Sequence, residues 1–326
     1  MAKANVVVSR KPPGPALSKL IEQCDTWVWE EDRPIPRDLF LRKIAEAEGL
    51  YTMIPDQVNA ELLAAAPRLR VVSTMAVGVD NIDVKACTAR GIPVGYTPGV
   101  VTEATADMAF ALILALSRRI VESAALVREG NWKAWSPTLM ISNDVFGKTL
   151  GIFGMGRIGK AVARRARGFA MPLLYHNRKP DPEGERELGV RYRAFDDLLA
   201  EADIVVVNAP LTPETRQIFN KSAFARMKRS AFFVNVARGG LVSQKDLHAA
   251  LNEGLIKGAA LDVTDPEPIP LDDPLRLNPK CLIVPHVGTC TWETRSEMTA
   301  ISVDNLLLGL VGKPLLFCIN AAPLGK

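Results

Sequence analysis

The stretch GMGRIG at residues 154–159 constrains the fold more than any other part of this chain. It follows an apolar, strand-length run at residues 149–153 and precedes a helical run, KAVARRARGF. In this setting Gly154 permits a tight turn, Gly156 lets the main chain approach a pyrophosphate, and Gly159 lets helix and strand pack closely. Amides at the start of the helix then face the anion, which the helix dipole also favours. The sequence therefore predicts a dinucleotide-binding strand–turn–helix.

Short β-branched runs alternate with amphipathic stretches along the whole chain, a pattern typical of parallel sheets covered by helices. Strands are expected at residues 6–9, 49–53, 71–74, 149–153, 173–176, 204–208, 232–236, 259–262 and 282–284. Helices are expected at residues 16–22, 36–47, 58–66, 102–119, 156–168, 195–201, 221–227, 243–253 and 294–310. The predicted fold class is α/β with doubly wound sheets, and 326 residues exceed what one hydrophobic core usually holds.

Composition excludes several classes of protein. Hydrophobic residues make up 48% and charged residues 23%, as in globular proteins. A net charge of +4 without a basic block argues against a nucleic-acid partner. The longest apolar run, residues 108–116, is short of the roughly 20 residues that span a bilayer, and MAKANVVVSR lacks the features of a secretory signal. Five widely spaced cysteines without a CxxC pair predict no metal site. We expect a cytoplasmic protein without membrane contact.

The turn after the second strand of the dinucleotide unit bears on cofactor choice. A site selective for NAD normally has an acid here to bond the ribose 2′-hydroxyl. This chain has Asn177, Arg178 and Lys179, and no acid before Asp181. A guanidinium can bind the 2′-phosphate of NADP through two parallel hydrogen bonds, whereas a carboxylate would repel it. NADPH is therefore the expected cofactor, with NADH as the weaker alternative.

Three chemically active side chains follow the ends of successive predicted strands. Arg238 lies beside two glycines after one strand, Glu267 lies in the loop DVTDPEP after the next, and His286 lies in PHVG after the last. Open α/β sheets place their ligands at these strand ends. Each residue alone has an ordinary explanation, as a surface cation, a solvated acid or a buried imidazole. Together, after one dinucleotide loop, they predict a catalytic set.

The chain resembles one protein family over essentially its whole length, and several stretches carry this resemblance. Residues 71–80, 91–98, 151–159, 235–242, 258–268 and 285–288 are similar to the D-isomer-specific 2-hydroxyacid dehydrogenases. Within that family the chain most resembles the glyoxylate reductase/hydroxypyruvate reductase branch. The residues that support this branch are STMAVGVD at 73–80, GYTP at 95–98, the pair Trp132 and Trp135, and the turn at Arg178.

The resemblance implies roles for the three side chains. Arg238 would bind the carboxylate and the 2-oxygen of the substrate. His286 would give a proton to the carbonyl oxygen as hydride arrives from the nicotinamide, and Glu267 would orient the imidazole and stabilise its charged form. The other two histidines agree with this assignment, because His248 lies in a predicted helix and His176 lies beside the expected adenosine pocket.

The resemblance also implies the remaining contacts. Val77 and Gly78 would bind the substrate carboxylate through their amides, and Asp262 would face the nicotinamide carboxamide. The cofactor-binding residues expected are Gly154, Gly156, Arg157, Ile158, Gly159, Asn177, Arg178, Lys179, Pro210, Val236, Asp262 and Gly288. The substrate expected is a small 2-oxo acid, reduced to a 2-hydroxy acid.

A domain division and a partner follow from the same resemblance. Residues 1–100 and 290–326 would form a split substrate domain, with a dinucleotide-binding domain at 101–289 inserted into it. Trp135 would reach the substrate site of a second copy, which implies a homodimer, although burial of the tryptophans in the core is an open alternative. Rival functions are a phosphoglycerate or phosphite dehydrogenase of the same family and a dinucleotide-sensing corepressor of the same fold.

Overall fold

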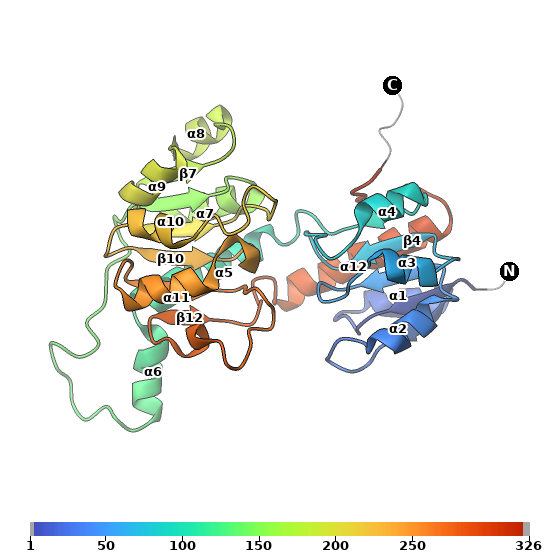
Figure 1. The fold of residues 1–326 in the computed structure, drawn as a ribbon, viewed down its shortest axis with the longest axis horizontal. Coiled ribbons are helices and arrows are strands. Elements are labelled where there is room, and N and C mark those ends of the chain that lie inside the picture. The colour runs from blue at the N-terminus through green and yellow to red at the C-terminus, as the bar shows by residue number, and fades with distance from the viewer. Residues whose placement is uncertain (1–2, 322–326) are drawn as a thin grey trace. The chain divides into compact units, whose positions relative to one another are not determined.

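The computed structural model describes residues 3–321, and the chain divides into two compact units (Figure 1). The first unit combines the N-terminal part up to Val101 with the C-terminal part from Cys290. The second unit is Thr102–Thr289. Both units are layered α/β structures with parallel sheets, which confirms the predicted fold class. The functions expected of the two units remain predictions.

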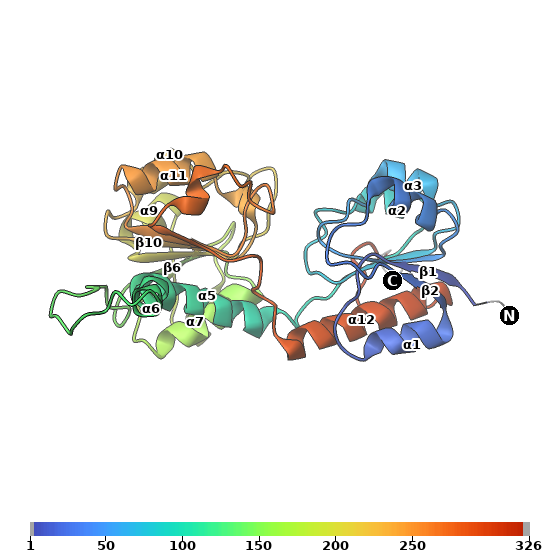
Figure 2. The same ribbon diagram turned by 90° about the horizontal axis from the view of Figure 1, so that it is seen from below.

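The first unit has a five-stranded parallel sheet in the order β2-β1-β3-β4-β5. Its strands are β1 (Asn5–Val8), β2 (Asp25–Val28), β3 (Gly49–Thr52), β4 (Val71–Thr74) and β5 (Val94–Gly95). Helices α1 (Ala16–Gln23) and α12 (Trp292–Leu310) cover one face, and α2 (Arg37–Ile44) and α3 (Ala60–Ala65) cover the other (Figure 2). A short helix, α4 (Val84–Ala89), precedes β5. The order is that of a flavodoxin-like doubly wound sheet.

The second unit has a seven-stranded parallel sheet in the order β12-β11-β10-β9-β6-β7-β8. Its strands are β6 (Leu150–Phe153), β7 (Leu173–His176), β8 (Arg191–Tyr192), β9 (Ile204–Val207), β10 (Phe232–Asn235), β11 (Gly258–Leu261) and β12 (Cys281–Ile283). Consecutive strands run outward from β6 in one direction and then from β9 in the other. This reversal between β6 and β9 is the switch point at which such sheets bind dinucleotides.

Two apolar layers enclose the second sheet. On one face, α5 (Thr102–Ser117) and α7 (Arg157–Arg167) pack on Ile152, Val206 and Val234. On the other face lie α9 (Phe195–Glu201), α10 (Lys221–Arg226) and α11 (Gln244–Asn252), which pack on Val205 and Phe233 (Figure 2). Alternate residues of each strand therefore belong to opposite cores. The apolar helix expected at residues 102–119 is buried on its own unit's sheet and ends early, at Ser117.

The sequence analysis missed several short elements. β2 begins with the exposed Asp25 at the sheet edge, and β8 and β5 have two residues each, too few for a periodic signal. Also missed were α4, α6 (Ile120–Arg128) and α8 (Pro182–Leu188). The last helix begins at Trp292 instead of residue 294, because the side chain of Thr291 caps it by accepting a hydrogen bond from the Thr294 amide.

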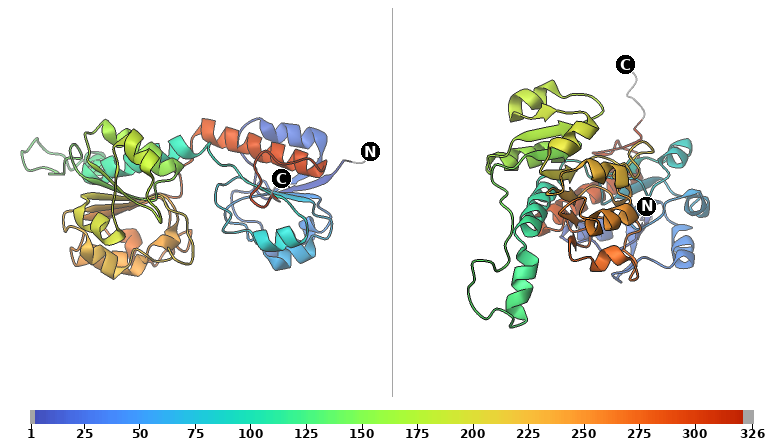
Figure 3. Two further views of the ribbon diagram at one scale, coloured as in Figure 1. Left: turned by 90° about the horizontal axis from the view of Figure 1, so that it is seen from above. Right: turned by 60° about the vertical axis from the view of Figure 1, so that its left-hand side comes forward.

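Helix α6 and the segment after it extend from the second unit (Figures 1 and 3). No residue of α6 is buried, and residues 130–144 form neither a helix nor a strand, as expected. Trp132 is 55% exposed and Trp135 is 79% exposed. The alternative that these tryptophans are buried in the core is therefore wrong for this chain.

Candidate active site

The glycine loop joins β6 to α7 and is packed tightly on its protein side. Gly154 has φ of +100°, and a Cβ there would lie 2.5 Å from the Ala209 nitrogen. A Cβ on Gly159 would lie 2.2 Å from the Gly154 oxygen, so this helix–loop contact also requires glycine. Gly156 is the N-cap of α7, and a Cβ built there would have no atom beyond its two neighbouring residues within 4 Å. The loop thus leaves room beside a helix N-terminus, and it fits the pyrophosphate of a dinucleotide.

The turn after β7 lies next to this loop. The side chain of Asn177 accepts a hydrogen bond from the Met155 amide at 2.8 Å, which ties the turn to the glycine loop. Arg178 and Lys179 are exposed. Asp181, the first acid after β7, caps α8 and pairs with Lys160 at 2.7 Å. The hydrogen bond from Lys160 lowers the pKa of Asp181. This carboxylate is therefore engaged in holding α8 against α7.

Arg238 lies in the loop after β10, whose main chain is held by Asn235. The Asn235 amide nitrogen donates to the Arg238 carbonyl at 2.9 Å, and its oxygen accepts from the Ala237 amide at 3.0 Å. A Cβ on Gly239 would lie 2.0 Å from main-chain atoms of Thr264, so this loop packs directly on the loop after β11. Val236, at the end of β10, is buried in the core.

Asp262 connects the loop after β11 to the segment after β12. This carboxylate is 2% exposed and accepts hydrogen bonds from the amides of Val287 at 2.7 Å and Gly288 at 2.9 Å. Burial raises its pKa, against the opposing effects of the Val287 amide and the charge of His286. A Cβ on Gly288 would lie 2.7 Å from the Asp262 carboxylate, so only glycine fits there. Asp262 thereby holds the chain immediately after His286.

Glu267 and His286 are in direct contact. The Nδ1 atom of His286 lies 2.5 Å from Oε1 of Glu267, and the Thr264 amide donates to Oε2 at 3.4 Å. The imidazole is 23% exposed and the carboxylate 37% exposed. His286 has φ of +54°, a left-handed conformation that costs free energy for a residue with a side chain and occurs at functional sites. With Nδ1 engaged, Nε2 is the ring nitrogen available for proton transfer.

The structure brings most of the expected residues to one edge of the second sheet. Arg238, Glu267 and His286 follow the carboxyl ends of the neighbouring strands β10, β11 and β12, and the glycine loop follows β6 at the same edge. Pro210 follows β9 there, and its carbonyl accepts a hydrogen bond from Thr215. Val77 and Gly78 lie in the first unit, after the carboxyl end of β4, with Val77 40% exposed.

The sequence analysis missed residues that support this edge. Asn235 fixes the Arg238 loop, and Gln244 on α11 accepts from the Asp265 amide at 2.5 Å and donates to Asp273 at 3.1 Å. Gln244 thereby holds both ends of the loop that carries Glu267. Asn235 had a usable signal, a polar residue that ends the apolar strand FFVN. Gln244 had none, because its partners are set by tertiary packing.

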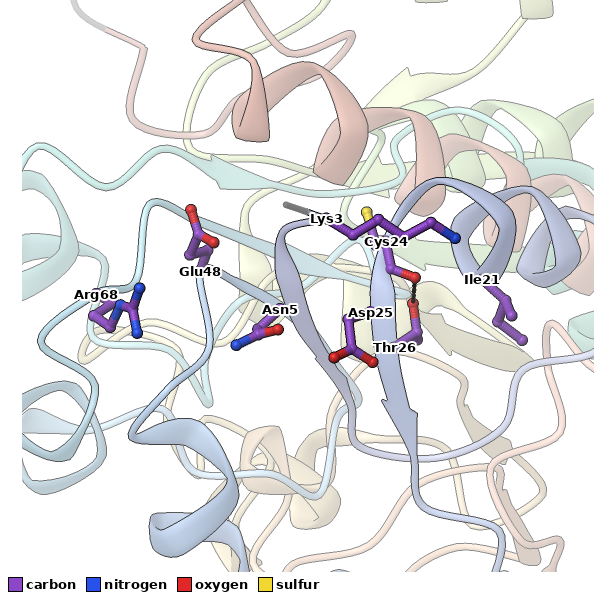
Figure 4. Close-up of a pocket in the computed structure, with 8 residues that line it drawn as sticks. All are labelled: Lys3, Asn5, Ile21, Cys24, Asp25, Thr26, Glu48 and Arg68. Carbon is purple, nitrogen blue, oxygen red and sulfur yellow. Dashed lines mark hydrogen bonds between the residues drawn. The ribbon is translucent and has the colours of Figure 1, made fainter. Parts of the chain in front are cut away.

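A cavity of about 650 Å³ lies elsewhere, in the first unit (Figure 4). Its lining includes Asn5 and Asp25, which begin β1 and β2, so it is at the amino ends of these strands. Figure 4 shows the side chain of Thr26 bonded to the carbonyl of Cys24 at this site. Within residues 3–321, no group of three or more His, Cys, Asp or Glu residues could hold a metal ion, and no helix is long and apolar enough to cross a membrane.

Comparison with known proteins agrees with this geometry. Residues 110–288 match the family model of the D-isomer specific 2-hydroxyacid dehydrogenase NAD binding domain. The chain is 47% identical over 306 residues to a glyoxylate reductase of Korarchaeum cryptofilum, with 94% of this chain and 92% of the relative covered.

Solved structures are similar over the same length. A protein of Thermus thermophilus has a TM-score of 0.92 at 43% identity, covering 97% of this chain and 99% of that one. An NADPH-dependent glyoxylate/hydroxypyruvate reductase of Sinorhizobium meliloti, in complex with NADP and malonate, has a TM-score of 0.85 at 30% identity, covering 98% and 97%. This chain therefore belongs to the D-isomer-specific 2-hydroxyacid dehydrogenase family, as the resemblance indicated.

Proposed function

We propose that this chain reduces small 2-oxo acids with NADPH, converting glyoxylate to glycolate and hydroxypyruvate to D-glycerate. The observation that carries the proposal is the contact of 2.5 Å between His286 and Glu267 at the sheet edge that also holds the glycine loop. An imidazole with a carboxylate on one nitrogen is a proton donor whose charged form is stabilised. The relatives named glyoxylate reductase support the choice of substrate.

When bound, the dinucleotide would supply the hydride. His286 gives the proton from Nε2 to the carbonyl oxygen, and Glu267 holds the imidazole through Nδ1 so that the ring keeps one orientation. Arg238, on a main chain fixed by Asn235, binds the substrate carboxylate through its planar, permanently charged guanidinium. Asp262 keeps the His286 segment in place through two amide hydrogen bonds, and a lone pair remains on each oxygen for the nicotinamide carboxamide.

The substrate side of the site is proposed to come from the other unit. Residues 1–100 and 290–326 would bind the substrate carboxylate through the amides of Val77 and Gly78, while residues 101–289 bind the cofactor. The position of Val77 after the carboxyl end of β4 supports this proposal, because open α/β sheets place their ligands at these strand ends.

NADPH preference rests on the turn after β7. Arg178 and Lys179 are exposed there, while the carboxylate of Asp181 bonds to Lys160 and to the Gly184 amide at the start of α8. We expect Arg178→Ala to lower kcat/KM for NADPH about 10- to 100-fold, the loss of one or two charge-assisted hydrogen bonds, and to leave kcat/KM for NADH within about twofold. Arg229→Ala is the matched control, because this exposed arginine precedes β10 and so lies at the amino edge of the sheet. A wild-type protein that prefers NADH would contradict the assignment.

Substrate choice is tested by NADPH oxidation with glyoxylate, hydroxypyruvate, pyruvate and phosphohydroxypyruvate side by side. Glyoxylate and hydroxypyruvate should give the highest kcat/KM. Preference for phosphohydroxypyruvate would favour the phosphoglycerate dehydrogenase alternative, and oxidation of phosphite with NAD would favour the phosphite enzyme. A protein that binds the dinucleotide and turns over none of these acids would favour the corepressor alternative.

A further inference from the structure

The side chain of Asn208 has an unusual environment. It follows β9, and neither its amide nitrogen nor its amide oxygen has a hydrogen-bond partner among residues 3–321, although both atoms are buried. Buried polar groups are nearly always paired, because an unpaired one loses its hydrogen bonds to water without replacement. Both polar atoms of the Asn208 side chain can therefore bond to a group that binds there.

The position of Asn208 identifies the kind of partner. Its main-chain amide donates to the Phe153 carbonyl at 2.8 Å, which continues the β6–β9 ladder by one residue and places Asn208 beside the glycine loop. A Cβ on Gly154 would lie 2.8 Å from the carbonyl carbon of Asn208. Asn208 therefore stands at the switch point of the sheet, where a dinucleotide crosses from one half to the other.

The pleat of β9 indicates the direction of the side chain. Val205 and Val207 belong to the core on the α9–α11 face, and Ile204 and Val206 belong to the core on the α5–α7 face. Alternation places Asn208 on the same face as Val206. That is the face of α7, whose N-terminus the glycine loop presents to the pyrophosphate. The Asn208 side chain is therefore expected on the α5–α7 face, at the carboxyl end of β9.

We infer that Asn208 is a cofactor-binding residue, whose side-chain amide bonds to the dinucleotide between the pyrophosphate and the nicotinamide ring. The amide can donate to a phosphate or ribose oxygen and accept from a ribose hydroxyl, so both unpaired atoms gain partners. Asn208 as a whole is partly exposed, and within residues 3–321 no side-chain hydrogen bond holds its amide in the present orientation. This inference rests on the dinucleotide cofactor but not on the identity of the substrate.

The inference predicts opposite effects of one substitution on stability and on binding. Asn208→Leu removes two unpaired polar atoms with a modest change in volume, so the cofactor-free protein should keep or raise its Tm. The same change should weaken dinucleotide binding at least about tenfold, which corresponds to about 1.4 kcal/mol. NADH and NADPH should be affected equally, because the turn proposed to hold the 2′-phosphate follows β7, which β6 separates from β9. Arg178→Ala, in contrast, should affect NADPH alone.

The measurement is calorimetric titration of the dinucleotide-free protein with NADH and NADPH, together with its Tm. Asn208→Ala is the second variant, in case leucine does not fit. Ser117→Ala is the matched control, because its buried hydroxyl also lacks a partner in the described chain but lies at the end of α5. A Kd that stays at the wild-type value in folded Asn208→Ala would overturn the inference alone. A wild-type protein that binds neither dinucleotide would overturn the cofactor proposal itself.

Discussion

At the scale of single residues, Glu267 and His286 form one hydrogen-bonded unit. The losses of kcat caused by substituting each residue should therefore not be additive in free energy. The carboxylate holds Nδ1 of the imidazole at 2.5 Å, so its effect on proton transfer passes through the ring. We expect His286→Ala to lower kcat by about 10²- to 10⁴-fold, the usual contribution of a general acid, with dinucleotide affinity retained. Glu267→Gln keeps the shape of the side chain and should lower kcat by a smaller factor, about 10- to 100-fold.

A variant with both Glu267→Gln and His286→Ala tests whether the two residues act as one unit or contribute to kcat independently. If Glu267 acts through His286, the variant with both changes should be no slower than His286→Ala alone. Single-turnover rates with saturating NADPH measure this directly. Multiplication of the two losses would show that Glu267 has a separate role, and unchanged turnover of His286→Ala would remove the mechanism.

At the scale of elements, Asp203 joins three parts of the second unit at the amino edge of its sheet. Its carboxylate accepts hydrogen bonds from the Thr149 amide at 3.0 Å and from Lys228 at 2.8 Å. These groups precede β6 and β10, the two neighbours of β9. Burial by itself would raise the pKa of Asp203, but the bonds from Lys228 and Thr149 outweigh it and leave the pKa below its ordinary value.

The lowered pKa predicts how the stability of this junction depends on pH. A carboxyl whose folded pKa is depressed stabilises the fold above its ordinary pKa, roughly 4, and that contribution is lost as pH falls through the folded value. Asp203→Asn should therefore lower the free energy of unfolding by about 0.5–1 kcal/mol near neutral pH, discounted for partial exposure, and by less below roughly pH 4. Urea unfolding at both pH values measures it. An equal loss at both would contradict the prediction.

Which elements the sequence predicts depends on how much of their stability is local. The glycine loop and the buried strands carry their own patterns, so β6, β9 and β10 lie where periodicity placed them, within a residue. The short edge strands β5 and β8 do not: each has two residues, and β8 takes its hydrogen bonds from β7. The contact of Asp262 with the amides of Val287 and Gly288 also could not be predicted from the sequence, because it depends on the register of β11 against β12.

At the scale of the whole molecule, α6 and the segment after it expose several large apolar side chains. This surface, here termed the arm, is 42–79% exposed at its large apolar residues, which are Ile120, Val121, Val127, Trp132, Trp135, Leu139 and Ile141. Large contiguous apolar patches are rare on monomers. We propose that a second copy of this chain covers the arm, and that Trp135 reaches that copy's substrate site.

The arm gives a prediction that separates assembly from catalysis. Burial of about 100 Å² of one indole contributes roughly 2.5 kcal/mol, so Trp132→Ala with Trp135→Ala should weaken the dimer at least about tenfold. Sedimentation velocity across protein concentrations measures this, and Trp292→Ala, a comparably exposed tryptophan of the first unit, is the matched control for assembly.

If Trp135 also completes the partner's site, Trp135→Ala alone should raise KM for glyoxylate at concentrations that keep the dimer intact, with dinucleotide affinity unchanged. A wild-type protein that sediments as a monomer at micromolar concentration would contradict the assembly, and an unchanged KM would restrict Trp135 to the interface.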